Sequence, residues 1–203
     1  MPSTTLVANV IVIPLTPWLQ TRFGRRQYFT ATVIGFTVVS ALCGMSGSIE
    51  ALIALRILQG LFGGGLIATA QATLRDTFTT AEVGLSQGIF AVIILVGPII
   101  APMLGGYLVD AASWQWIFFI NILPGAISAI IVATMLRNPT EPESAGVDTG
   151  GIVLLTLALG GLQFMLEEGE RRDWFDSPSI VIAAATAAIG GLAFVLWELF
   201  GTR

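Results

Sequence analysis

Residues 51–73, ALIALRILQGLFGGGLIATAQAT, form an apolar stretch that contains a single charged side chain, that of Arg56. A bilayer core about 30 Å thick is crossed by a helix of roughly 20 apolar residues. The stretch therefore predicts a transmembrane helix. An Arg placed several residues inside such a helix costs on the order of 2.5–3.5 kcal/mol on insertion scales. We expect Arg56 to face a watery cavity or a partner carboxylate.

The small and polar residues of this stretch fall on one helical face, at positions i, i+3, i+4, i+7 and i+8. They are Arg56, Gln59, Gly60, Gly63 and Gly64. The alternative interpretation is an Arg that snorkels to the membrane interface above a glycine face used only for packing. No carboxylate lies inside the apolar stretches, since Glu50, Asp110 and Glu198 all lie at their ends. A proton-coupled machine would then carry its acid on a helix outside this chain.

The same length rule gives seven spans over the whole chain. They lie at about residues 4–20, 28–46, 51–73, 84–109, 114–136, 149–167 and 178–199. Only 11% of the residues are charged, against roughly 25% in ordinary soluble domains. A soluble fold with so few charges could not cover its own surface. The sequence predicts an all-α, polytopic bundle of transmembrane helices.

The positions of the Arg residues predict the orientation in the membrane. If the loop after the first span is cytoplasmic, six Arg lie inside: Arg22, Arg25, Arg26, Arg75, Arg137 and Arg203. Arg171 and Arg172 are then the two outside. Residue 1 is predicted outside and residue 203 inside. A chain that starts outside normally has an earlier helix, so we expect a truncated N-terminus, with Met1 as an alternative or mis-assigned start.

The residue types that the chain lacks exclude several kinds of chemistry. It contains no His, and all nine basic residues are Arg. Ser-His-Asp hydrolysis, His-ligated metal sites, Schiff-base lysines and the phosphate-loop Lys are therefore excluded within this chain. Cys43 stands alone, so no disulfide framework exists. We expect no enzyme activity, no metal, no cofactor and no nucleic-acid partner.

The span at 84–109 combines two helix-bending prolines with a row of small residues. Gly97, Ala101 and Gly105 recur every four residues, while Pro98 and Pro102 each remove a backbone donor. Gly106 follows directly. This combination favours a bend, and either a hinge or a sealing interface with another helix. Ordinary tight packing is the alternative, because Gly and Pro are common in membrane helices.

Two connections carry further candidate residues. Leu19 to Arg26 reads as a tight turn in which Gly24 permits the reversal. There Arg22, Arg25 and Arg26 either cap helix ends and pair across the cytoplasmic face, or only set topology. At the outer start of the fifth span, Trp114 and Trp116 favour an aromatic interface belt. Asn121 lies deeper and needs a hydrogen-bond partner.

These segments, in this order, resemble the major facilitator superfamily, and specifically its drug:proton antiporters with fourteen spans, the EmrB/QacA type. Residues 17–26, PWLQTRFGRR, are similar to the family's loop motif between helices two and three. Pro17 stands where Gly is usual and Thr21 where Asp is usual. Residues 52–60 resemble the helix-four motif, and residues 98–106 the helix-five antiporter motif, with Ala101 in place of Gly. Residues 114–121 and 169–174 are similar to the start of helix six and to the loop between helices seven and eight.

On this resemblance the seven spans correspond to helices two to eight. It implies a transporter bundle at residues 1–136, a cytoplasmic linker at 137–148 and two additional transmembrane helices at 149–203. On the same resemblance, we expect helix one and the C-terminal six-helix bundle to be missing from this chain. Because alternating access needs two bundles around a central site, we expect that the chain cannot transport alone.

The resemblance also implies a function. It predicts proton-coupled multidrug efflux from a bacterial inner membrane, with hydrophobic compounds and protons as substrates and Arg56 in proton coupling. Relatives often work with a periplasmic adaptor and an outer-membrane channel. Two alternatives stay open: a non-functional or regulatory membrane fragment, and a seven-helix receptor, for which the absence of Lys excludes a retinal linkage.

Overall fold

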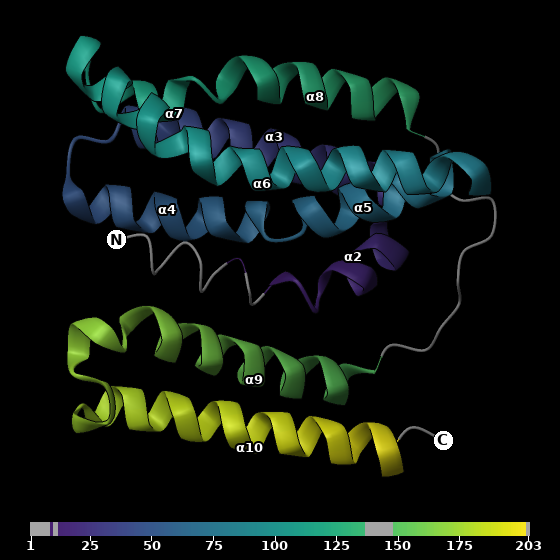
Figure 1. Ribbon diagram of the computed structural model, residues 1–203, viewed down its shortest axis with the longest axis vertical. Coiled ribbons are helices and arrows are strands. Elements are labelled where there is room, and N and C mark those ends of the chain that lie inside the picture. The colour runs from purple at the N-terminus through teal and green to yellow at the C-terminus, as the bar shows by residue number, and fades with distance from the viewer. Residues whose placement is uncertain (1–8, 10–11, 137–147, 202–203) are drawn as a thin grey trace.

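The computed structural model describes residues 9, 12–136 and 148–201, and these residues form helices and no strands. Figure 1 shows the helices lying side by side along one common direction. Their bounds are α2 Thr16–Phe23, α3 Arg25–Gly44, α4 Ile49–Gly63, α5 Leu66–Thr77, α6 Thr80–Ala111, α7 Trp116–Phe119, α8 Ile122–Met135, α9 Thr149–Glu168 and α10 Pro178–Phe200, with the short 3-10 helices η1 Glu170–Arg172 and η2 Trp174–Asp176 in the last connection.

Six segments among the described residues are long and apolar enough to cross a membrane. They are Arg25–Gly44, Ile49–Thr77, Thr80–Ala111, Trp116–Met135, Thr149–Glu168 and Pro178–Phe200. Each coincides with one of the predicted spans, to within a few residues at either end. Residues 4–8, 10 and 11 of the first predicted span, about 4–20, lie outside the described residues, and α2 covers its end.

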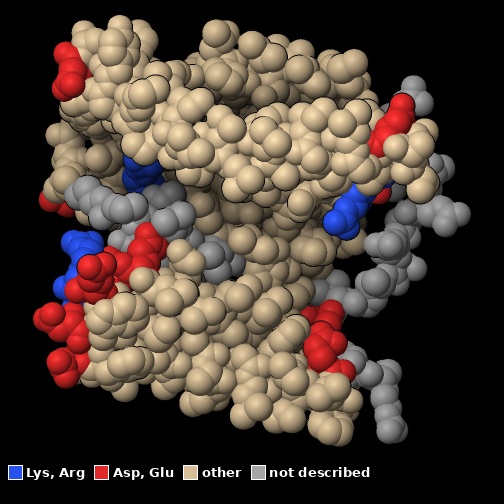
Figure 2. Space-filling view, viewed as in Figure 1, with Lys and Arg blue, Asp and Glu red and all other residues tan. Residues whose placement is uncertain are grey.

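Successive connections lie alternately at the two ends of the bundle (Figure 1). At one end lie the α2–α3 and α5–α6 connections, the start of α9 and the ends of α8 and α10. At the other end lie the α3–α4, α6–α7 and α9–α10 connections. Charged side chains gather mainly at these two ends, and the band between them is largely uncharged (Figure 2). This distribution is the one that a bilayer imposes, because a charge in hydrocarbon is costly.

Helix α3 is the centre of the N-terminal part, and it packs against α2, α4, α5, α7 and α8. Val39 and Cys43 of α3 form a buried apolar cluster with Phe118 of α7. Side chains of α4 and α7 cover this cluster, among them Leu52, Leu55, Phe62 and Ile117. The cluster holds α4 and α7 against α3 and so sets the position of Arg56.

The span at 49–77 is interrupted at Gly64 and Gly65, where the predicted span was one continuous helix. A Cβ on Gly64 would overlap the backbone of Asn9, and one on Gly65 would overlap the hydroxyl of Tyr28. Only residues without a side chain allow these neighbours to come so close. The close approach of these neighbours therefore requires glycine at the interruption, which divides the span into α4, which carries Arg56, and α5.

The turn between α2 and α3 consists of one residue, which is shorter than the predicted turn over Leu19–Arg26. Gly24 has φ 82° and ψ 140°, a conformation that side chains with a Cβ rarely adopt. Because Gly24 alone reverses the chain, α2 continues to Phe23 and α3 begins at Arg25.

Helix α6 runs without interruption from Thr80 to Ala111, through both Pro98 and Pro102. A capping box starts it, in which Thr79 and Glu82 each bind the other's backbone. None of its residues is buried. The helix thus contacts its neighbours only loosely and leaves most of its apolar surface exposed.

Helices α9 and α10 form a closely packed pair. Gly161 lies against the backbone of Ala183 and Ala187, and Gly190 lies against the backbone of Ala158. At one end of the pair, Asp148 accepts a hydrogen bond from the Gly151 amide at 2.9 Å and from the Trp197 indole at 2.9 and 3.0 Å. At the other end, the buried Glu168 accepts from Arg171 and Arg172, each at 3.2 Å. Helices α9 and α10 are thus held together by their own contacts. Of the predicted linker 137–148, only Asp148 is among the described residues.

Gly65→Ala tests whether the close approach of Tyr28 at the interruption requires glycine. We expect the free energy of unfolding to fall by about 1–3 kcal/mol, because the new methyl group has to displace the Tyr28 hydroxyl and Thr16. The measurement is thermal unfolding of the detergent-solubilised protein. The control is Gly84→Ala in α6, where the methyl group meets open space and where Ala favours the helix. Equal stability of the two variants would contradict the explanation.

Candidate functional site

Arg56 is half-buried inside the Ile49–Thr77 span, where it contacts its own helix and α7. Its Nη1 donates to Oε1 of Gln59 at 3.2 Å. The central carbon of its guanidinium lies 4.5 Å from the centre of the Phe118 ring, within cation–π range. None of the ion pairs between described residues includes Arg56. Its charge is therefore held by an amide oxygen and an aromatic face.

The other predicted residues of the helical face that contains Arg56 lie further along α4. Gln59 is only 3% exposed, and Gly60 is buried as well. Gly63 and Gly64 lie against Asn9. The structure thus brings Gln59 next to Arg56 and places the glycines where another segment approaches α4.

A chain of hydrogen bonds joins α3, α7 and α8 beside Phe118. Asn121 donates from Nδ2 to Ser40 Oγ at 3.2 Å and to the Ile117 carbonyl at 3.3 Å. Ser40 in turn donates to the Phe118 carbonyl at 3.0 Å. Asn121, for which the sequence analysis required a partner, therefore has two, and they position the backbone of the residue under Arg56.

The two tryptophans of the same stretch pack edge-to-face on the phenylalanines that follow them. Trp114 lies 6.0 Å from Phe118, and Trp116 lies 6.0 Å from Phe119, measured between ring centres. Both tryptophans are partly exposed. Their position at the α6–α7 connection agrees with an interface belt, and Trp114 also orients the ring that contacts Arg56.

The arginines of the α2–α3 turn connect α3 to two other helices at the Gly24 end of the bundle. Arg25 forms an ion pair with Asp76, near the end of α5. Arg26 donates to the Ala133 carbonyl in the last turn of α8. Arg22 is exposed in the last turn of α2. The turn thus provides both predicted roles, an ion pair and a cap of helix-terminal carbonyls.

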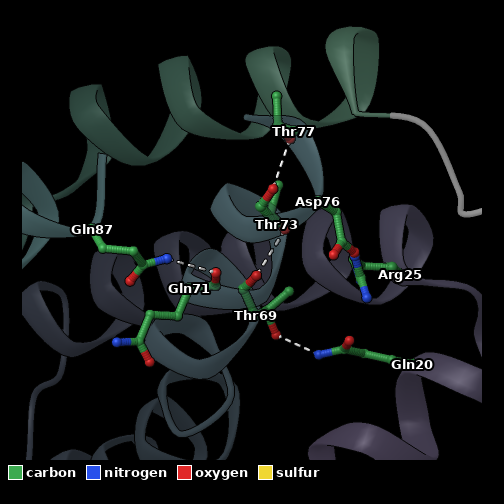
Figure 3. A network of polar contacts seen from close by, with 8 residues as sticks. All are labelled: Gln20, Arg25, Thr69, Gln71, Thr73, Asp76, Thr77 and Gln87. Atoms are coloured by element: carbon green, nitrogen blue, oxygen red, sulfur yellow. Dashed lines mark hydrogen bonds and ion pairs between the residues drawn. The ribbon is translucent and has the colours of Figure 1, made fainter. Parts of the chain in front are cut away.

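Polar side chains around α5 extend this connection (Figure 3). Gln20 of α2 donates from Nε2 to Thr69 Oγ1 at 2.9 Å. Thr73 and Thr77 each donate to a carbonyl one turn earlier, at 2.7 Å. Gln87 of α6 donates to the Gln71 carbonyl at 3.4 Å. Sequence reasoning missed Gln20, Thr69 and Asp76, although the spacing of Thr69, Thr73 and Thr77 marks one polar face of the helix.

The predicted motif of α6 is not brought together with Arg56. Its residues lie on the exposed surface of α6 or are half-buried, and a Cβ added at Gly97, Gly105 or Gly106 would meet nothing within 4 Å. Pro98, Ala101 and Pro102 are likewise exposed. The glycine row therefore has no closely packed neighbour among the described residues.

An apolar cleft of about 460 Å³ lies between α3, α5, α6 and α8. Its walls include Phe29 and Phe36 of α3, Phe90 of α6 and Pro124 of α8. Asn121, Thr37 and Ser128 are the polar residues that line it. The cleft separates α6 from the centre of the bundle, which accounts for the loose packing of α6.

The sequence profile described as Major Facilitator Superfamily matches residues 1–202. The chain belongs to this superfamily. It is 40% identical over 195 residues to the multidrug export protein EmrB of Haemophilus influenzae, an alignment that covers 95% of this chain and 38% of that protein. It is 37% identical to EmrB of Escherichia coli K12 and 38% identical to the fatty acid resistance protein FarB of Neisseria gonorrhoeae, with the same coverage.

The family assignment and the six apolar helices confirm three predictions: the all-α transmembrane bundle, the multi-pass location in a bacterial membrane and membership of this transporter superfamily. The chain spans about 38% of the length of the relatives that it matches. What the whole protein transports, and with which partners, is therefore taken up below as a proposal.

Reversing the Arg25–Asp76 pair tests whether the α2–α3 turn holds α5 through charge. We expect Arg25→Glu to lower the free energy of unfolding by up to about 1 kcal/mol, because Asp76 is 55% exposed and water screens the pair. Adding Asp76→Arg should restore most of the loss. Thermal unfolding at low and high salt measures both effects, and high salt should reduce them. If the reversed pair fails to recover stability, charge does not hold this contact.

Proposed function

We propose that this chain is the Arg56-bearing part of a proton-driven exporter of hydrophobic compounds. The observation that carries the proposal is the half-buried Arg56, which lies inside a membrane span and has only Gln59 and Phe118 as polar and aromatic partners among the described residues. A charge at such depth is costly and typically marks an ion or proton pathway. The names of the relatives, which include multidrug export proteins, support efflux as its purpose.

In the proposed mechanism, Arg56 alternates between two partners. A guanidinium nearby favours the ionised form of a carboxyl group, so Arg56 pairs with an acid on another helix while that acid is deprotonated. When the acid takes up a proton, the attraction ends. The guanidinium then rests on Phe118 and Gln59, the arrangement that the described residues have. Both positions give the charge a partner, which keeps the cost of moving it low.

Helix α6 supplies the second element of the proposal. Its exposed glycines and prolines form the face on which another helix packs closely, and this face seals or bends as the transporter changes state. The proposal also divides the chain into two parts. Residues 1–136 act in transport as one bundle, and the pair α9–α10, which holds itself together, is an addition to it. A second bundle is needed for alternating access.

The partners follow from the location. Hydrophobic compounds reach the protein from the inner leaflet or the cytoplasm, and protons flow inward. In a bacterium with two membranes, a periplasmic adaptor and an outer-membrane channel would carry the compound onward. Co-purification of the longest product of the gene from such cells tests this part of the proposal, and recovery of no envelope protein would remove it.

Arg56→Ala tests proton coupling. We expect dye efflux by cells that carry the longest product of the gene to fall at least roughly ten-fold, since a ten-fold change corresponds to about 1.4 kcal/mol and the loss of a buried charge pair exceeds this. The residual efflux should no longer respond to a protonophore. Arg56→Lys keeps the charge and should retain part of the activity.

The matched control is Arg75→Ala, which removes an exposed Arg from the end of α5 and should leave efflux unchanged. Normal, protonophore-sensitive efflux by Arg56→Ala would sink the coupling role. Absence of any efflux by the unmodified protein, with all the dyes tried, would sink the proposed transport itself.

A further inference from the structure

Four uncharged polar side chains meet where α2, α3 and α5 come together: Thr16, Gln20, Tyr28 and Thr69, here named the neutral cluster. Thr16 Oγ1 donates to the Val12 carbonyl at 2.9 Å and lies 3.3 Å from the Tyr28 hydroxyl. Gln20 Nε2 donates to Thr69 Oγ1 at 2.9 Å. The cluster therefore links residues that are up to about fifty positions apart in the chain.

Three members of the cluster are among the most deeply buried polar groups of the described residues, and the fourth, Gln20, is half-buried. Thr69 is 0% exposed, Thr16 1% and Tyr28 7%. A buried hydroxyl that loses its partner keeps the full cost of its removal from water, so these bonds are more valuable than their counterparts on the surface. Hydrogen bonds between uncharged groups act only at contact distance, so a buried cluster of this kind sets the relative position of the helices that it joins.

The spacing of the cluster shows how the three helices fit together. Thr16 and Gln20 lie four residues apart on α2, so both project from one face. Gly65 and Thr69 have the same spacing at the start of α5. Gly65 leaves room for the Tyr28 hydroxyl, and Thr69 receives Gln20 one turn later. The cluster thus lies directly beside the Gly64–Gly65 interruption, on the α5 side of it.

The neighbouring residue Thr21 does not make this connection. Its hydroxyl donates to the Trp18 carbonyl within α2 at 2.8 Å, and the residue is exposed. The ion pair of Arg25 starts on α3, and its partner Asp76 is more than half exposed. The Gln20–Thr69 bond is therefore the contact through which α2 itself holds the buried face of α5.

We propose that Gln20 and Thr69 are positioning residues for transport, whose hydrogen bond makes α2 and α5 move as one unit about the interruption at Gly64–Gly65. Helix α4, which contains Arg56, ends at this interruption, and α5 begins directly after it. A displacement of α4 that follows a change at Arg56 can pass to α2 through α3, which packs against both helices, and through α5 where the Gln20–Thr69 bond attaches α5 to α2. The neutral cluster is this attachment. For its transport readout the inference rests on the proposed function.

The test compares Gln20→Ala, Thr69→Val and the double variant in the longest product of the gene, reconstituted in proteoliposomes. We expect each single variant to lower the maximal rate of proton-driven dye transport roughly three- to ten-fold, the equivalent of one net hydrogen bond. The dye concentration at half-maximal rate should change less than about two-fold, and the pH profile should keep its shape. The double variant should be no slower than the slower single variant, because both remove the same bond.

Two further variants separate positioning from general packing. Thr69→Ser keeps the hydroxyl and should retain at least about half of the rate, so that rescue depends on the bond rather than on the methyl group. Thr73→Val makes the same substitution one turn later, where the hydroxyl bonds only within α5, and should transport like the unmodified protein. A Thr69→Val variant that transports at the normal rate would overturn the proposal. So would a double variant whose loss is the product of the two single losses, or a loss as large in Thr73→Val.

Thermal unfolding in detergent of the unmodified protein, the two single variants Gln20→Ala and Thr69→Val, and their double variant reports on the bond without transport. Coupling between Gln20 and Thr69 in the double-mutant cycle, seen as midpoints that do not add, is expected. If the unmodified protein transports nothing, the proposed function fails while this coupling still tests the contact. Additive midpoints would overturn the attachment of α2 to α5 even in an active transporter.

Discussion

The structure depends on one constraint, namely that hydrocarbon offers no hydrogen-bond partner, so that polar groups in the spans depend on partners within the protein. Most threonines meet this constraint within their own helix. Thr37, Thr156 and Thr186 each donate to a carbonyl four residues earlier, at 2.7 to 2.8 Å. Because such bonds lie within one helix, they do not hold that helix to its neighbours.

The polar groups that bond between helices are fewer, and they mark the places where the bundle has a defined geometry. Asn121 and Ser40 hold α8 to α3, and Gln20 and Thr69 hold α2 to α5. Arg56 rests on Phe118 of α7. Because apolar side chains gain little by leaving lipid for one another, these bonds and the close approach of small residues provide much of the specificity. The candidate site is built where both occur together.

The span positions were predictable from the sequence because the bilayer sets the length of an apolar helix. The face of Arg56 and Gln59 was also predictable, since a spacing of three residues is a local property of a helix. The interruption at Gly64 and Gly65 was not. Glycine lowers helix propensity by only about 1 kcal/mol, and the residues whose close approach requires glycine there, Asn9 and Tyr28, lie far away in sequence. The contacts of Phe118 with Arg56 and of Asp76 with Arg25 were not predicted for the same reason, because their partners are also distant in sequence.

Two glycine patterns of the same kind have different outcomes in this chain, and the difference bears on α6. Gly161 and Gly190 in α9 and α10 lie directly against a neighbouring backbone, with added Cβ atoms meeting it at 2.7 and 3.0 Å. Gly97 and Gly105 in α6 face open space among the described residues. Each helix-interior glycine costs stability unless close packing offsets the loss. This contrast supports the proposal that the glycine row of α6 is a surface for a further helix, and α9 and α10 demonstrate in the same chain what such a contact looks like when it is made.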